Sequence, residues 1–455
     1  MRTLCLLLAL VPALLFAQTT PWTVDDALNQ ERISQVSIAP DGQRVAWIKS
    51  SPDKEKDRFT SDLYLSLLPD SGSDSDPEIL QLTRTGNNRS PLWSPSGHRL
   101  AFLSSRKNPD AKNASGQQIW LLDPRGGAPQ PLTTMPAGVR GFEWKSDSTI
   151  VFTGREKKTA YETYLEGRKD DVLVVEDTTL FFPVRLFSVE VHGKKVRRLT
   201  DNQLRIGSFA VSPTGQHAVY TLNRSPITAD ARVQPTQHLL NLETSETVEI
   251  FEGQYFDPSG FDWTLDGSGF YASDEFSSDP ENEGAGITEL YYFDVASMSH
   301  EKVPLDWDWG VGYGYAVSKN GIHVQLANGT TFLPRYYEKT SDGWRHVDAT
   351  DVRLRHSTSV TIGPDGETMV FDYSRPDVPP TYNYGKYLEG HVAQEGEVAK
   401  LNGYLKKRTP LRAEVIQWEG AEQDSVNGIL YYPSDYQEGR RYPLVTVIHG
   451  GPSGV

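Results

Sequence analysis

The sequence has one cysteine, Cys5, and it lies in the apolar stretch at the extreme N-terminus. A single thiol excludes an internal disulfide, and the body of the chain has neither a thiolate metal ligand nor a cysteine nucleophile. Aspartates that precede glycine recur along the chain, but hairpin turns explain them better than metal binding does. We therefore expect no cofactor and no metal site.

Long hydrophobic runs are also missing outside the N-terminus. Met1-Arg2-Thr3 is followed by an apolar run of 13 residues, Leu4–Phe16. This run is shorter than the roughly 20 residues that span a bilayer, and its layout is that of a secretory signal peptide. Residues 1–17 are thus predicted to direct export to the periplasm or the extracellular space, without stable insertion into a membrane.

Positive charge is scarce, because 45 Lys and Arg face 60 Asp and Glu, which gives a formal net charge of −15. Nucleic-acid binding depends on a basic face that neutralises phosphates, so this class of function is excluded. The basic triplet Lys406-Lys407-Arg408 is interpreted as part of a solvated linker. The sequence does not indicate an oligomeric state.

What the chain does contain is a repeat. An apolar pair, a Ser/x-Pro-Asp/x-Gly turn and an alternating strand recur seven times, with a mean spacing of (366 − 42)/6 = 54 residues. Asp-Gly and Asn-Gly between alternating strands indicate hairpins. The turns are marked by Gly42, Gly97, Asp147, Gly215, Gly267, Gly321 and Gly366.

Two further short strands follow each hairpin, and four strands per period of about 50 residues are typical of a propeller blade. We therefore predict an all-β fold, a closed seven-bladed β-propeller over residues 34–390. Ahead of it, Thr23-Val-Asp-Asp26 has the spacing of a capping box, which predicts a short helix within the arm 18–33.

A different pattern follows the predicted linker 391–412. Leu444–Ile448 is apolar and β-branched, lies between Pro443 and the turn Gly450-Gly451, and is predicted to be a buried strand. We interpret residues 413–455 as the start of an α/β-hydrolase domain. No G-x-S-x-G nucleophile motif occurs up to Val455. The nucleophile is expected beyond this residue, so the chain by itself should be inactive.

The order of propeller, Asn427-Gly-Ile-Leu-Tyr-Tyr-Pro433 and His449-Gly-Gly-Pro452 resembles the prolyl oligopeptidase family of serine peptidases, in particular its acylaminoacyl-peptidase and dipeptidyl-aminopeptidase-like branch. The resemblance implies a Ser-Asp-His triad, absent from this chain, and a propeller that restricts substrates to short peptides. It also implies that backbone N–H groups of Gly450 and Gly451 stabilise the oxyanion. His449 would support that loop rather than act as the base.

The resemblance also suggests substrate contacts on the propeller. Family members that remove N-terminal dipeptides hold the substrate amine with propeller carboxylates, a role that Asp274 and Glu275 could fill. The alternative is that these residues, with Asp279, Glu281 and Glu283, form a solvated acidic loop. The aromatic residues Trp307, Trp309, Tyr313 and Tyr315 could line a peptide pocket or fill the core between blades.

Two other functions remain open. The chain could be a stand-alone propeller that binds a partner in the cell envelope, or part of an esterase, since His-Gly-Gly also occurs in esterases. A propeller ahead of the His-Gly-Gly-Pro loop argues against the esterase. A G-x-S-x-G motif encoded beyond Val455 would favour the peptidase.

Overall fold

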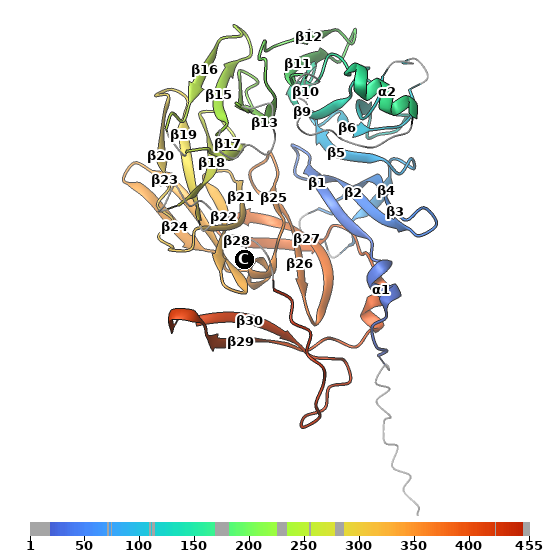
Figure 1. Ribbon diagram of the computed structural model, residues 1–455, viewed down its shortest axis with the longest axis vertical. Coiled ribbons are helices and arrows are strands. Elements are labelled where there is room, and N and C mark those ends of the chain that lie inside the picture. Colours follow the sequence, from blue (N-terminus) through green and yellow to red (C-terminus); the bar gives the residue numbers. More distant parts are fainter. Residues whose placement is uncertain are drawn as a thin grey trace, which may run out of the picture.

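A computed structural model describes residues 19–448 except 71, 74, 109–110, 112–113, 169–181, 225–233, 254–255, 278–285 and 424. The predicted signal peptide, residues 1–17, lies outside the described part of the chain. Figure 1 shows seven small sheets arranged around a ring, with the N-terminal arm and a C-terminal hairpin below it. In the described ranges no helix has the length and apolar character needed to cross a membrane.

Each sheet is one blade of four antiparallel strands that are consecutive in sequence. Blade 1 comprises β1 (Arg32–Ile38), β2 (Arg44–Asp53), β3 (Arg58–Leu67) and β4 (Glu78–Gln81). Blade 2 comprises β5 (Asn88–Trp93), β6 (Leu100–Ser104), β7 (Gln118–Leu122) and β8 (Gln130–Pro131). Blade 3 comprises β9 (Val139–Ser146), β10 (Thr149–Gly154), β11 (Arg185–Glu190) and β12 (Val196–Arg198). Blade 4 comprises β13 (Ile206–Val211), β14 (His217–Leu222), β15 (Thr236–Asn241) and β16 (Thr247–Ile250).

The remaining blades follow the same order. Blade 5 comprises β17 (Ser259–Trp263), β18 (Gly269–Phe276), β19 (Ile287–Asp294) and β20 (Ser299–Lys302). Blade 6 comprises β21 (Val311–Val317), β22 (Ile322–Asn328), β23 (Thr331–Thr340) and β24 (Gly343–Asp348). Blade 7 comprises β25 (Val360–Ile362), β26 (Thr368–Arg375), β27 (Val378–Leu388) and β28 (His391–Glu397). The helical segments are α1 (Val24–Leu28), α2 (Ala160–Arg168), η3 (Val352–His356), η4 (Gly403–Lys407) and η5 (Ala421–Gln423).

The seven blades confirm the predicted all-β propeller. The last sheet continues to Glu397, so residues from 391 that the sequence analysis placed in the linker form the outer strand of blade 7. The short helix predicted from the capping box is also present. The Thr23 side chain accepts a hydrogen bond from the backbone N–H of Asp26, and the Asp26 side chain accepts from that of Thr23.

Three tryptophans fasten neighbouring blades near the ring axis. Each lies in the second half of an inner strand and donates an indole N–H hydrogen bond to a backbone carbonyl of the preceding blade. The pairs are Trp93 with Ser37 at 3.0 Å, Trp144 with Leu92 at 3.1 Å and Trp263 with Ala210 at 3.3 Å. A large apolar ring thus fills the gap between blades while its one polar atom remains satisfied.

Where the next blade carries valine instead of tryptophan, a carboxylate side chain of the preceding blade accepts a hydrogen bond from the backbone N–H of that valine. Glu143 of blade 3 accepts a hydrogen bond from Val211 N at 2.5 Å, and Asp262 of blade 5 accepts one from Val317 N at 3.2 Å. Burial raises the pKa of Glu143 to about 7 and that of Asp262 to about 6, against the opposing effect of these hydrogen bonds. Glu143 and Asp262 therefore connect neighbouring blades, but ionisation of these buried carboxyl groups at higher pH costs folding free energy.

Blades 1 and 7 close the ring through side chains, because among the described strands none from one end of the chain joins the blade of the other. Thr368 Oγ1 donates to Gly42 O at 3.1 Å, and Ser66 Oγ donates to Val398 O at 2.8 Å. Gly42 has φ of +66°, and a Cβ atom there would lie 2.1 Å from an Asp365 carboxylate oxygen. Glycine is thus required both for the turn and for the close approach of the two blades.

The chain enters and leaves the propeller on one face, which we call the linker face. It is the end of each blade at which the inner strand begins and the outer strand ends. The hairpin of β29 (Ala413–Glu419) and β30 (Ser425–Tyr431) adjoins it. Leu411 N donates to Pro376 O at 3.3 Å, and a Cβ at Gly329 would lie 3.6 Å from the Asn427 side chain.

The prediction of a buried strand at Leu444–Ile448 is wrong for this structure. These residues form no strand, and Val447 and Ile448 are each 87% exposed. A buried strand needs neighbours that pair its backbone and cover its side chains. In the described part of the C-terminal region, β29 and β30 pair only with each other, so no α/β unit is formed there.

Candidate functional site

The carboxylates singled out in the sequence, Asp274 and Glu275, lie at the end of β18 on the linker face. Asp274 Oδ1 accepts a hydrogen bond from the backbone N–H of Asp257 at 3.3 Å, and Asp257 accepts one from the Gln237 side chain. Asp257 lies just before β17, so the structure brings two aspartates of blade 5 together. Sequence reasoning missed Asp257, because only the antiparallel pairing of β17 with β18 places it beside Asp274.

Burial, with a smaller contribution from the nearby Asp274 carboxylate, raises the pKa of Asp257 to about 7. Burial likewise raises the pKa of Asp274 to about 6, with smaller contributions from the Glu289 and Glu275 charges. Within the described residues none of Asp257, Asp274 and Glu275 forms an ion pair, whereas Glu289 is paired with Lys302. A bound cation would relieve this uncompensated negative charge.

Glu275 differs from Asp274 because its side chain is exposed. Its carboxylate accepts a hydrogen bond from Gly286 N at 3.1 Å, and the adjacent Phe276 is 52% exposed. An accessible carboxylate beside an accessible aromatic ring can contact a charged group and its apolar neighbour at once. Asp279, Glu281 and Glu283, of the same predicted acidic loop, lie outside the described residues.

The four aromatic residues of blade 6 divide into two pairs. Trp307 and Tyr315 pack against a core cluster, and their polar atoms bond to backbone carbonyls of Ala327 and Gly260 respectively. Trp309 and Tyr313 are 56% and 60% exposed. The first pair fits the core interpretation, and only the second pair is placed to meet a ligand.

A basic group occupies the same face on the neighbouring blades, and sequence reasoning missed it. Arg140 is the second residue of β9, Arg155 directly follows β10 and Arg205 directly precedes β13. Arg140 is exposed as a whole residue, but partial burial of its guanidinium group lowers its pKa. The charges of Arg155 and Arg205 lower the pKa further, and the Glu162 carboxylate opposes the shift. Arg155 is neutralised by Glu162 of α2 at 2.7 Å, while Arg140 and Arg205 form no ion pair with any described residue.

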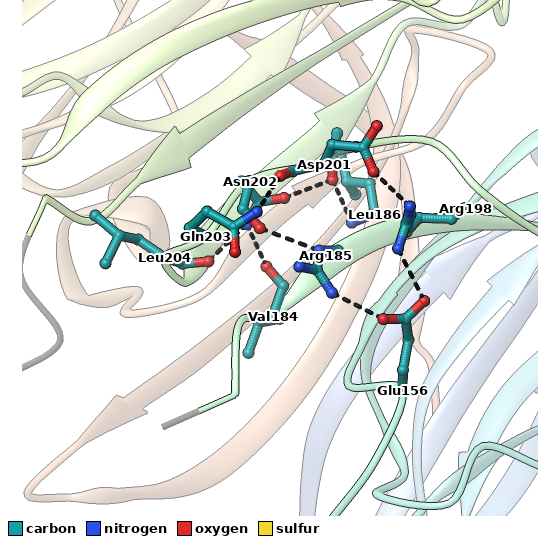
Figure 2. Close-up of polar contacts among 10 residues, drawn as sticks. Glu156, Val184, Arg185, Leu186, Arg198, Asp201, Asn202, Gln203 and Leu204 are labelled. Carbon is teal, nitrogen blue, oxygen red and sulfur yellow. Dashed lines mark hydrogen bonds and ion pairs between the residues drawn. The ribbon is translucent and has the colours of Figure 1, made fainter. Parts of the chain in front are cut away.

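A polar network, drawn in Figure 2, holds the segments that carry these arginines. Asn202 donates to Val184 O at 2.8 Å and to Leu204 O at 2.6 Å, and Arg185 donates to Asn202 O at 3.0 Å. The same Arg185 pairs with Glu156 at 2.8 Å, next to Arg155. These contacts fix both the residue that follows Arg155 and the segment that precedes Arg205 and connects blade 3 to blade 4.

The predicted oxyanion residues Gly450 and Gly451, together with His449, lie outside the described part of the chain. Their proposed role therefore remains a prediction from the sequence.

Comparison with known proteins adds a second line of observation. No protein-family model matches the chain. It is 23% identical over 460 residues to the uncharacterized peptidase YuxL of Bacillus subtilis and 20% identical over 464 residues to dipeptidyl-peptidase 5 of Porphyromonas gingivalis. These alignments cover 94% and 93% of this chain but only 66% and 62% of the two relatives.

The fold matches a solved acylaminoacyl peptidase, in complex with Z-Gly-Gly-Phe-chloromethyl ketone, with a TM-score of 0.66 and 15% identity. That match covers 93% of this chain and 61% of the other. Sequence and fold thus agree with the order of motifs found at the outset, and the chain is similar over nearly all its length to propeller-bearing peptidases of the prolyl oligopeptidase family.

Proposed function

We propose that this chain is the propeller-bearing portion of an exported serine peptidase that hydrolyses short peptides. The similarity to peptidases over 94% of the chain carries the proposal. Because the chain spans 66% or less of its relatives, the triad would be supplied by residues that follow Val455. The exposed apolar side chains of β29, β30 and residues 444–448 would then be covered by the rest of a hydrolase domain.

In this proposal the linker face of the propeller faces the catalytic domain and gates access to it. Asp274 and Glu275 would hold the α-amino group of a peptide, with Asp257 supporting Asp274. The exposed rings of Trp309 and Tyr313 on the next blade would contact apolar side chains of the peptide. Backbone N–H groups of Gly450 and Gly451 would stabilise the oxyanion of the tetrahedral intermediate.

The test begins with the protein as its host produces it, incubated with a serine-directed fluorophosphonate and with aminoacyl and dipeptidyl chromogenic amides. We expect covalent labelling and hydrolysis, both abolished by substitution of the labelled serine. A polypeptide that ends at Val455 should show neither. Absence of labelling in the host-produced protein would contradict the peptidase and favour the second candidate, a propeller that binds a partner in the cell envelope.

A further inference from the structure

Two members of the basic group, Arg140 and Arg205, each have a charged counterpart at the equivalent position of a neighbouring blade. We take as reference the residue of each inner strand that is equivalent to Trp93, namely Trp144 in blade 3, Val211 in blade 4 and Trp263 in blade 5. Arg89 and Arg140 lie four residues before this reference in blades 2 and 3 (93 − 89 = 144 − 140). Arg205 and Asp257 lie six residues earlier in blades 4 and 5 (211 − 205 = 263 − 257). The position six residues before the reference is therefore positively charged in blade 4 and negatively charged in blade 5.

The backbone explains why these positions are available to a ligand. In blades 1 to 6 the pairing of the inner strand with the next strand shifts register at its linker-face end, as between Arg89 and Leu92 or opposite Arg140. Such bulges release a residue from the ladder and re-aim its side chain, and they recur next to functional sites. Arg89 and Arg140 are exposed at these bulges.

Not every arginine of this face is available. Arg106 donates to Asn88 Oδ1 at 2.6 Å and lies 5.0 Å from the centres of the Phe102 and Trp120 rings. These contacts within the propeller engage its guanidinium group, so Arg106 has a structural role. Arg89, Arg140 and Arg205 form no ion pair with the described residues. The one described carboxylate that acts on this group, Glu162, is paired with Arg155. Grouping several cations with so little counter-charge is unfavourable, so the arrangement is best explained by an anionic ligand.

We propose that Arg140 and Arg205, with Arg89 at the equivalent position of the neighbouring blade, bind a carboxylate of the peptide, while the blade 5 carboxylates bind its amine. This inference rests on the proposed function and narrows its substrate class to short peptides that carry a free carboxylate opposite a free amine. The planar guanidinium group suits the task, because it can donate two parallel hydrogen bonds to a carboxylate. The network around Asn202 holds the backbone that leads into Arg205, through the hydrogen bond to Leu204 O. A backbone that is ordered before the ligand arrives reduces the entropy lost on binding.

The carboxylate could come from the C-terminus of the peptide or from an acidic side chain. Equilibrium binding to the host-produced protein is measured by calorimetry with three probes: tetra-alanine, its C-terminal amide, and the amide of Ala-Ala-Ala-Glu. We expect amidation of tetra-alanine to weaken binding by about tenfold to a hundredfold. Recovery with the glutamate probe would show that either carboxylate is accepted, and no recovery would assign the site to the C-terminus.

Variants connect the effect to the site. Arg140→Gln combined with Arg205→Gln should remove the difference between tetra-alanine and its amide, whereas Arg140→Lys should retain part of it. Arg125→Gln is the matched control, because Arg125 lies in the turn between β7 and β8, at the opposite end of the blade, and pairs with Asp123. Thermal unfolding of each variant establishes that the protein still folds.

The outcomes separate the two proposals. If amidation does not change binding, or if the double variant keeps the difference, the arginine site is refuted even when peptides are hydrolysed. If no peptide is hydrolysed but binding still depends on the carboxylate and on Arg140 and Arg205, the peptidase proposal fails and the arginine site stands.

Discussion

Arg408 and Asp26 form an ion pair at 2.7 Å across 382 positions of sequence, joining the segment that leaves blade 7 to the helix that precedes blade 1. Asp26 is nearly inaccessible, with a side chain 5% exposed, and it also completes the capping box with Thr23. Hydrogen bonding from Thr23, with a smaller effect of Arg408, lowers the pKa of Asp26. One carboxylate therefore both caps a helix and fastens the two ends of the propeller.

Arg408→Gln should free the N-terminal arm without unfolding the blades. Asp26 would keep its hydrogen bonds to Thr23 but would lose its charged partner. We expect earlier cleavage within residues 19–31 in limited proteolysis, while the main thermal transition changes little. The control is Arg412→Gln, whose ion pair with Glu414 is local and exposed. Equal protease resistance of the wild type and Arg408→Gln would contradict this prediction.

Trp263→Phe tests the contacts between blades. The phenyl ring retains most of the apolar contact but cannot donate the hydrogen bond that Ala210 O receives from the indole at 3.3 Å. Leaving a buried acceptor unsatisfied costs about 1–3 kcal/mol. We expect this loss in the free energy of unfolding measured with denaturant, against almost no change for Trp309→Phe on the exposed linker face. Equal effects of the two substitutions would show that the interblade hydrogen bond contributes little.

Glu143→Gln should change how stability depends on pH. The pKa of Glu143 is raised to about 7 in the folded protein from an ordinary value of 4.5, so the folded state favours the protonated form. Its contribution is therefore full below pH 4.5 and declines as pH rises toward 7. Glutamine keeps the acceptor for Val211 N but cannot ionise.

The variant should accordingly gain stability over the wild type at pH 8, by about 1–3 kcal/mol, with little difference at pH 4.5. Thermal unfolding across this range measures the effect. Glu367→Gln is a suitable control, because Glu367 is accessible and its Lys319 partner lies on the surface. A difference between the wild type and Glu143→Gln that is independent of pH would mean that this carboxylate does not titrate as the structure indicates.

Asp274→Asn and Glu275→Gln should weaken the recognition of peptides with a free amine in the host-produced enzyme. Losing a charged acceptor should raise KM for such peptides by about tenfold to a hundredfold, with no effect on N-acetylated peptides. Because the pKa values of Asp257 and Asp274 are raised to about 7 and 6, binding should strengthen as pH rises from 5 to 7. It should weaken again near pH 8, where the peptide amine loses its proton. An equal loss for acetylated peptides would argue against amine recognition.

Gly451→Val tests the predicted oxyanion loop in the same enzyme. Loss of one oxyanion donor typically lowers turnover by about 10²- to 10³-fold. His449→Ala should be milder if the imidazole only supports the loop. The opposite ranking of the two substitutions would assign His449 a chemical role.

The sequence by itself determined the repeat and hence the fold. Hairpin turns such as Asp41-Gly42 and Asp365-Gly366 depend on local backbone preferences, and the alternating strands beside them depend on a period of two, so both can be read without knowing what lies next to them. The capping box of Thr23 and Asp26 is equally local. The resemblance to the prolyl oligopeptidase family could also be recognised from the sequence, because each of its motifs is a contiguous stretch of the chain.

Only the tertiary structure decided which residues share the linker face. Asp257 meets Asp274 through strand pairing, and Arg140 meets Arg205 because adjacent blades pack side by side, so neither pair is visible in a linear sequence. The strand predicted at Leu444–Ile448 failed for a related reason. Its apolar composition describes a segment suited to burial, but burial depends on neighbouring strands, and in the described chain β29 and β30 pair only with each other.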